Sequence, residues 1–190
     1  MRGLLIAIRM TVVLTVLLGL IYPLALTGVA RVLFPWQSAG SLVSYRRQVI
    51  GSAIIGQNFS APQYFHSRPS AAGDKGYDAS GSGGSNLGPT NKTLIDRVAG
   101  DVQKARTENP SEPVPIDLVT NSGSGLDPDI SPAAAEFQVP RVAQSRNMKE
   151  EEVRALVGKH TQGRDLGFLG ERRVNVLELN LDLDSQPDPR

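Results

Sequence analysis

The residues best suited to chemistry begin with a stretch rich in glycine and serine at positions 80–89, SGSGGSNLGP. It leads into an expected helix with Asn91 as its N-cap, and free backbone N–H groups at a helix N-terminus can bind an anion such as a phosphate. The stretch lacks the lysine of a phosphate-binding loop. A loop of several tight turns, in which glycine supplies the positive φ angles, accounts for the same residues. We therefore expect no nucleotide or other cofactor to be held there.

A second polar stretch, NSGSGLDPDISP at 121–132, has the alternating oxygen ligands of a calcium loop in Asp127, Asp129 and Ser131. A calcium loop needs glycine at its sixth position and a bidentate glutamate at its twelfth. This sequence has Pro132 and Gln138 there. We therefore expect no metal site, and we interpret Ser131 as the N-cap of a helix whose first residue is Pro132.

The two histidines, His66 and His160, are isolated in the sequence from any metal-binding spacing. A serine hydrolase would need one of them as its base, but no G-x-S-x-G motif surrounds Ser82, Ser85 or Ser124. The absence of cysteine excludes thiol nucleophiles, thiolate metal sites and disulfides. We expect no catalytic residue, although a fold can assemble a Ser-His-Asp triad from distant positions.

The charge of the 190-residue chain is unevenly distributed. The formal net charge is +1, yet no acidic residue precedes Asp74. Six basic residues precede it: Arg2, Arg9, Arg31, Arg46, Arg47 and Arg68. The rest of the chain therefore has fourteen basic and nineteen acidic residues. This basic head and acidic body argue against nucleic acid as a partner.

The head contains a charge-free apolar run at 10–30 that predicts a transmembrane helix. As a helix it would be roughly 32 Å long, enough to cross a bilayer core of about 30 Å. A cleavable signal peptide is disfavoured because the run is too long and contains Pro23. Thr15 and Gly19 have the spacing that lets a second helix pack closely in lipid. The arginine count on the two sides of the run does not favour a cytoplasmic N-terminus.

Positions 1–36 thus form a predicted membrane anchor, 37–184 a single extracytoplasmic domain and 185–190 a tail. Aromatic residues in the stretch 57–91 indicate an ordered loop rather than a linker. Apolar periodicity predicts three strands and three helices, which together indicate an α+β domain. The expected strands are 49–55, 114–120 and 177–183; the expected helices are 91–106, 132–146 and one that opens with a capping box at 147–150 and ends at Gly158.

Five sequence blocks resemble the C subunit of the bacterial Kdp potassium-transporting ATPase. They are GLIYPLALTGVARVLFP, GSAIIGQNFSAPQYFHSRPSA, GSGGSNLGPTN, VPIDLVTNSGSGLDPDISPAAAEFQVPRVA and HTQGRDLGFLGERRVNVLELNLDLD. The similarity runs from about Gly19 to Asp184, nearly the whole chain.

The resemblance implies a noncatalytic accessory subunit of a high-affinity potassium uptake complex that uses ATP and potassium. Its implied partners are a channel-like potassium-translocating subunit, a P-type ATPase subunit, a small single-span subunit and membrane lipid. It also implies one span of the inner membrane, with the N-terminus cytoplasmic and the large domain outside. Members are described as catalytic chaperones that raise the ATP affinity of the ATPase subunit. Because the domain lies outside, that effect must pass through helix packing or partner subunits.

Within this resemblance, the two polar loops are better explained as contact surface for the channel-like subunit. The candidate residues are Ser82, Gly83, Gly84, Ser85, Asn86, Leu87 and Gly88 in the first loop, and Ser122, Gly123, Ser124 and Asp127 in the second. Thr15 and Gly19 are candidates for packing within the membrane. The alternative function is a membrane-anchored extracytoplasmic hydrolase that uses serine, aspartate and histidine.

Overall fold

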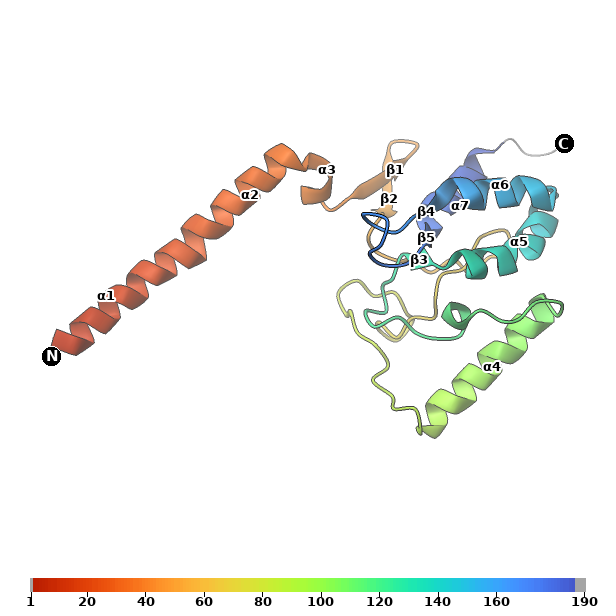
Figure 1. The fold of residues 1–190 in the computed structure, drawn as a ribbon, viewed down its shortest axis with the longest axis horizontal. Coiled ribbons are helices and arrows are strands. Elements are labelled where there is room, and N and C mark those ends of the chain that lie inside the picture. The colour runs from red at the N-terminus through yellow and green to blue at the C-terminus, as the bar shows by residue number, and fades with distance from the viewer. Residues whose placement is uncertain (1, 187–190) are drawn as a thin grey trace. The chain divides into compact units, whose positions relative to one another are not determined.

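The computed structural model describes residues 2–186 (Figure 1). Contacts divide the chain after Leu42 into two units, the N-terminal helical unit and the body. The expected tail at 185–190 lies largely outside the described residues, since 187–190 are not described. The chain mixes helices and strands, with an apolar N-terminal helix followed by a compact domain, as the sequence predicts.

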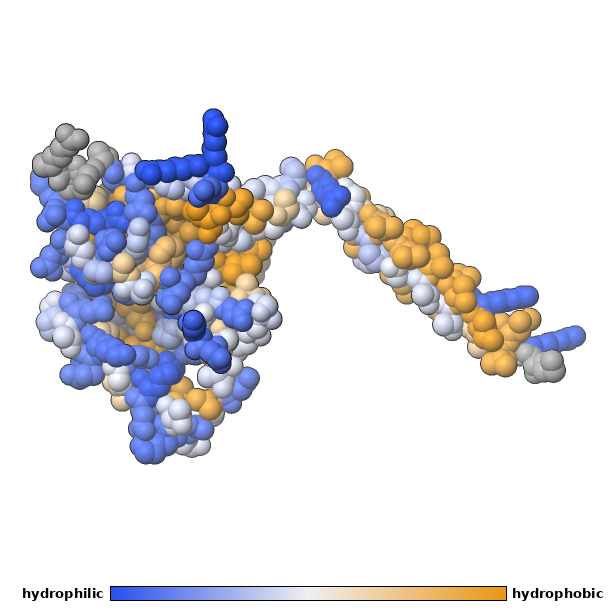
Figure 2. Space-filling model, turned by 180° about the vertical axis from the view of Figure 1, so that it is seen from behind, coloured by the Kyte–Doolittle hydropathy of each residue, from blue (hydrophilic) through white to orange (hydrophobic). Residues whose placement is uncertain are grey.

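The N-terminal unit is one long helix made of α1 (Arg2–Val16), a π-helical segment (Leu17–Ile21) and α2 (Tyr22–Leu33). The wider π turn immediately precedes Pro23, which has no N–H to donate to the preceding turn. None of its residues is fully buried, and Figure 2 shows hydrophobic colour along most of its length. The 32-residue helix is long and apolar enough to cross a membrane. It ends before Pro35, and a short helix α3 (Pro35–Ser38) follows.

The body contains two small sheets. Strands β1 (Leu42–Tyr45) and β2 (Gln48–Ser52) form the first, joined by a turn in which Arg46 and Arg47 have positive φ. The second has the order β3-β5-β4 and is antiparallel throughout. Its strands are β3 (Asp129–Ile130), β4 (Thr161–Gln162) and β5 (Arg173–Asn175). The register pairs Val174 with both Ile130 and Thr161, so Val174 lies in the centre of this sheet and is fully buried.

Three helices surround this sheet and form the core: α5 (Pro132–Arg146), α6 (Glu150–His160) and α7 (Val176–Ser185). Their buried apolar side chains pack with Phe65 from the long loop. Helix α4 (Lys92–Glu108) lies at the periphery, with Ala105 as its one buried residue. Burial of apolar surface therefore concentrates on α5, α6, α7 and β5.

Several expectations from the sequence are confirmed by local capping. Asn91 caps α4, since its Oδ1 accepts a hydrogen bond from the Thr93 N–H at 2.9 Å. Ser131 caps α5 in the same way, because its Oγ accepts from the Ala134 N–H at 3.1 Å. The segment between β2 and α4 contains no helix or strand and is nevertheless anchored in the core by Phe65, as expected for an ordered loop.

The strand expected at 177–183 is wrong, because this stretch forms α7. The alternation of leucines with polar residues suggested a half-exposed strand. In the structure the buried side chains include Val176, Leu179, Asn180 and Leu183, which have helical spacing. The alternation misled because Asn180 is a core residue despite its polarity.

The strand expected at 114–120 is also wrong, because a short 3₁₀ helix (Ile116–Leu118) takes its place directly after Pro115. The strand expected at 49–55 is shorter than predicted, since β2 ends at Ser52. The third predicted helix does not stop at Gly158 but continues to His160.

The capping box expected at 147–150 also differs from the prediction. Asn147 instead ends α5 in a left-handed conformation with φ 52°. The Glu152 carboxylate accepts a hydrogen bond from the Lys149 N–H at 3.1 Å at the start of α6.

Candidate functional site

The two predicted contact loops lie side by side in the body. The Gly83 N–H donates to the Ser124 carbonyl oxygen at 2.8 Å, and the Ser82 hydroxyl donates to the same oxygen at 3.1 Å. The loops approach so closely at Gly84 that a Cβ there would lie 3.2 Å from the Gly123 carbonyl oxygen. We call this pair of bonded loops, residues 82–88 and 122–127, the loop junction.

The outer part of the loop junction faces solvent. Asn86, Leu87 and Gly88 are exposed, whereas Ser85 is half-buried and Ser122 is buried. Ser82 and Ser124, which take part in the hydrogen bonds between the loops, are exposed as well. Contact of these loops with another subunit stays a prediction.

Asp127 belongs to an internal network. The Arg68 Nη1 atom lies 3.1 Å from Asp127 Oδ2, and Arg68 Nη2 donates to the Asn121 carbonyl oxygen at 3.3 Å. The Tyr77 hydroxyl donates to the Arg68 carbonyl oxygen, and burial raises the pKa of Tyr77. Asp127 thus links the loop junction to the segment around Arg68.

Asp129, the second residue of the rejected calcium motif, pairs with Arg173 and Asn175 across the sheet. Its Oδ2 lies 3.5 Å from Arg173 Nε, and its Oδ1 accepts from Asn175 Nδ2 at 3.3 Å. Burial, and then the nearby charge of Asp127, raise the pKa of Asp129. Among residues 2–186, no group of three acidic or histidine side chains is arranged to hold a metal ion.

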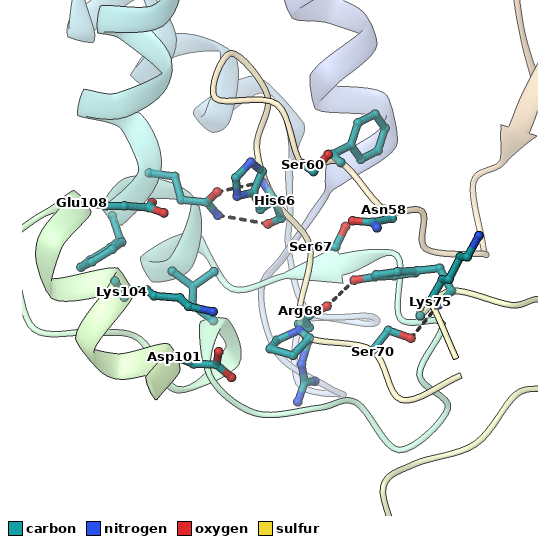
Figure 3. A pocket seen from close by; sticks show the side chains of 18 residues that line it. Asn58, Ser60, His66, Ser67, Arg68, Ser70, Lys75, Asp101, Lys104 and Glu108 are labelled. Atoms are coloured by element: carbon teal, nitrogen blue, oxygen red, sulfur yellow. Dashed lines mark hydrogen bonds between the residues drawn. The ribbon is translucent and has the colours of Figure 1, made fainter. Parts of the chain in front are cut away.

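A cavity of about 480 Å³, which the sequence did not suggest, lies beside α4 (Figure 3). Asp101, Lys104 and Glu108 of α4 line one side of it. Figure 3 shows them across from an extended segment that carries His66 and Arg68. The charged residues of α4 have the spacing i, i+3, i+7, which places them on one helical face. This charged helical face is the sequence signal that could have indicated that α4 lines a cavity.

Buried amide side chains hold the cavity's extended segment in place. Gln138 of α5 pairs with both backbone groups of His66: the His66 N–H donates to Oε1 at 2.8 Å, and Nε2 donates to the His66 carbonyl at 3.1 Å. Asn180 of α7 does the same for Phe65, with distances of 2.8 and 3.0 Å. Arg141 adds a hydrogen bond to the Tyr64 carbonyl oxygen at 2.9 Å. These contacts explain why a loop without regular structure is ordered.

The two histidines are engaged at separate places. His66 Nε2 lies 3.1 Å from the Ala61 carbonyl oxygen, to which its N–H donates, and burial lowers the pKa of His66, which favours the neutral ring. His160 Nε2 lies 2.8 Å from Asp182 Oδ2. Hydrogen bonds from Lys159 and then His160 lower the pKa of Asp182. This geometry does not favour the hydrolase alternative.

Thr15 and Gly19 lie one helical turn apart on the N-terminal helix. Both are exposed, and a Cβ at Gly19 would meet only the Thr15 methyl group, at 4.0 Å. The small side chains therefore leave an open strip on the helix. Helix packing at this strip stays a prediction.

Comparison with known proteins gives a consistent result over almost the entire chain. The sequence model of the KdpC family, described as "K+-transporting ATPase, c chain", matches residues 4–185. A potassium-transporting ATPase KdpC subunit of Koribacter versatilis is 59% identical over 189 residues, which cover 99% of this chain and 97% of that protein. The KdpC subunit of Bradyrhizobium diazoefficiens is also 59% identical, covering 94% of each chain. These matches confirm the resemblance, and the chain belongs to the KdpC family of potassium-transporting ATPase subunits.

Proposed function

We propose that this chain is a noncatalytic accessory subunit of a high-affinity potassium uptake complex driven by a P-type ATPase. The observation that carries the proposal is the family match over residues 4–185, which takes in both the apolar helix and the body. The catalytic subunit, which hydrolyses ATP, is then a different chain. This chain itself holds neither ATP nor a metal cofactor.

The proposed partners are a channel-like potassium-translocating subunit, the P-type ATPase subunit and a small single-span subunit. The loop junction supplies contact surface for the channel-like subunit, which is supported by its exposed outer residues and by its internal hydrogen bonds. Because these loops are fixed before binding, association costs less conformational entropy than ordering a free loop. The Thr15–Gly19 strip packs against another helix, and the rest of the apolar helix contacts lipid.

The accessory role is to raise the affinity of the ATPase subunit for ATP, as a catalytic chaperone. ATP is cytosolic, whereas the body lies outside the inner membrane in this proposal. The effect therefore passes through packing of the anchor helix and through the partner subunits, as a coupling free energy between distant sites.

The proposed topology predicts that the body is digested when protease is added outside spheroplasts. The apolar helix anchors the chain with a single crossing, and a large C-terminal domain can be translocated largely regardless of its charge. The measurement is an immunoblot with a tag at each terminus: the N-terminal tag should survive on a short protected fragment and the C-terminal tag should be lost. A cytosolic marker that stays intact is the control. Survival of the C-terminal tag until detergent is added would show the opposite orientation.

The accessory role predicts a higher KM for ATP when the complex is assembled without this chain. Couplings between sites typically amount to about 1–3 kcal/mol, so we expect KM to rise at least about fivefold. The measurement is ATP hydrolysis by purified complex with and without the chain, and adding the full chain back should restore the low KM. An unchanged KM, with the chain demonstrably present only in one preparation, would contradict the chaperone role.

A further inference from the structure

The connection between β4 and β5 carries three large apolar side chains on the outside of the body. Leu166 is 83% exposed, Phe168 70% and Leu169 48%. We call these three side chains the apolar knob. Large apolar residues scattered singly over a surface need no explanation, but three within four positions do. In Figure 1 this connection is the dark blue loop beside β4 and β5.

The backbone of the apolar knob is fixed by its own hydrogen bonds. The Asp165 N–H donates to the Leu169 carbonyl oxygen and the Leu169 N–H donates to the Asp165 carbonyl oxygen, both at 2.9 Å. Two ion pairs close the base of the loop, Arg164 with Glu171 at 2.7 Å and Arg173 with Asp165 at 3.3 Å. The knob is therefore a preformed turn.

Leu166 has φ 53°, in the left-handed region that bulky residues avoid. Such conformations persist where the surrounding structure enforces them, and they concentrate at binding sites. Here the hydrogen bonds between Asp165 and Leu169 enforce the left-handed conformation of Leu166, and its side chain is exposed to solvent. The fold thus holds an unfavourable conformation that yields no apolar burial within this chain.

The surface next to the knob continues toward the loop junction. A hollow of about 380 Å³ is lined by Arg172, Ile116 and Asp127, among others. Ile116 is itself exposed, and Asp127 belongs to the loop junction. Residues 163–173 contain three arginines and two carboxylates, so the base of the knob is slightly basic. An apolar centre with a polar, arginine-containing rim is the usual composition of a protein interface.

We propose that the apolar knob inserts into an apolar pocket, rimmed by carboxylates, on the extracytoplasmic surface of another subunit of the same ATPase. The inference rests on the proposed function, which supplies that subunit. A protein pocket has a fixed shape, so a preformed turn lowers the cost of binding it. Lipid has no fixed shape, so insertion into lipid does not require a turn held in an unfavourable conformation. Continuity with the loop junction extends the interface over one surface of the body.

The test uses the absence of cysteine in this chain. Phe168→Cys introduces one thiol at the knob, and Ile95→Cys introduces one on α4, where Ile95 is 53% exposed. We expect a maleimide to label Phe168→Cys about tenfold or more slowly in the assembled complex than in the isolated chain, because the core of an interface excludes solvent. Ile95→Cys should react at the same rate in both. Labelling is measured on the band of this chain alone.

The outcomes separate the inference from the function on which it rests. If the chain assembles and Phe168→Cys reacts equally fast in both states, the knob is not an interface and the proposed function stands. If the unaltered chain does not copurify with any ATPase subunit, both proposals are wrong. If Phe168→Cys is already protected in the isolated chain within vesicles of phosphatidylcholine and phosphatidylglycerol, lipid covers the knob and the inference is wrong.

A second variant addresses the same surface without labelling. Leu166→Ser combined with Phe168→Ser should lower the amount of copurifying complex about tenfold, since residues at interface centres dominate affinity. Its thermal unfolding temperature should equal that of the unaltered chain, because both side chains are exposed. Undiminished copurification would overturn the inference.

Discussion

Replacing Asn180 by leucine should lower the free energy of unfolding of the body by about 2–5 kcal/mol, because it leaves two buried backbone groups without partners. Asn180 is only 1% exposed, and its amide accepts from the Phe65 N–H and donates to the Phe65 carbonyl oxygen. Leucine has nearly the same shape, so the loss reflects hydrogen bonds rather than a cavity. Phe65 is itself fully buried, so water cannot easily replace the lost partner.

Urea unfolding of the full chain in detergent, followed by near-ultraviolet circular dichroism, measures this change. Gln103→Leu on α4 is the matched control, since Gln103 is exposed and its replacement should change stability by less than about 0.5 kcal/mol. Without the amide, the segment that follows Phe65 is held less firmly. Because this segment forms a wall of the cavity beside α4, its backbone amides should exchange their hydrogens faster in the variant. Equal stability of the Asn180→Leu and Gln103→Leu variants would show that the amide does not anchor the loop.

This same residue shows where prediction from the sequence fails. The leucines around Asn180 alternate with polar residues, and a polar residue is normally assigned to the solvent side. Only the tertiary contact with Phe65, far away in the sequence, makes an amide favourable in the core. The helix α7 therefore could not be distinguished from a strand by periodicity alone.

Features encoded locally were predicted well. The N-terminal helix follows from a long charge-free run, and α4 and α5 begin at side-chain caps that can be recognised within four residues. The 3₁₀ helix at Ile116–Leu118 was missed although Pro113 and Pro115 argue against a central strand.

The candidate site was only partly accessible from the sequence. The composition of each polar loop indicated tight turns, but the hydrogen bonds from Ser82 and Gly83 to Ser124 join segments without any periodic pattern. The apolar knob was not predicted, because the exposure of Leu166 and Phe168 depends on how the sheet is covered. The left-handed conformation of Leu166 is visible only in three dimensions.

Replacing Gly125 by alanine should lower the free energy of unfolding by about 3 kcal/mol. Gly125 has φ 67°, and a left-handed conformation costs a residue with a Cβ roughly 1–2 kcal/mol. The added Cβ would also lie 2.7 Å from the Gly83 carbonyl oxygen and 2.9 Å from Ala72. Both are parts of packed backbone, and Ala72 is fully buried, so the loops must move apart. The Ser70 hydroxyl donates to the Gly125 carbonyl oxygen at 2.5 Å, and this hydrogen bond would be distorted as well.

Gly123→Ala is the matched control, two residues away in the same loop. A Cβ there would meet no atom within 4 Å, and Gly123 does not have a positive φ. Its stability should therefore be unchanged or slightly higher, because alanine restricts the unfolded chain. Urea unfolding compares the two variants, and copurification with the ATPase adds a functional readout. If Gly125→Ala unfolds like Gly123→Ala, the loops do not depend on this close approach. If it is less stable and also assembles poorly below its unfolding midpoint, the bonded geometry of the loop junction is required for contact with the partner.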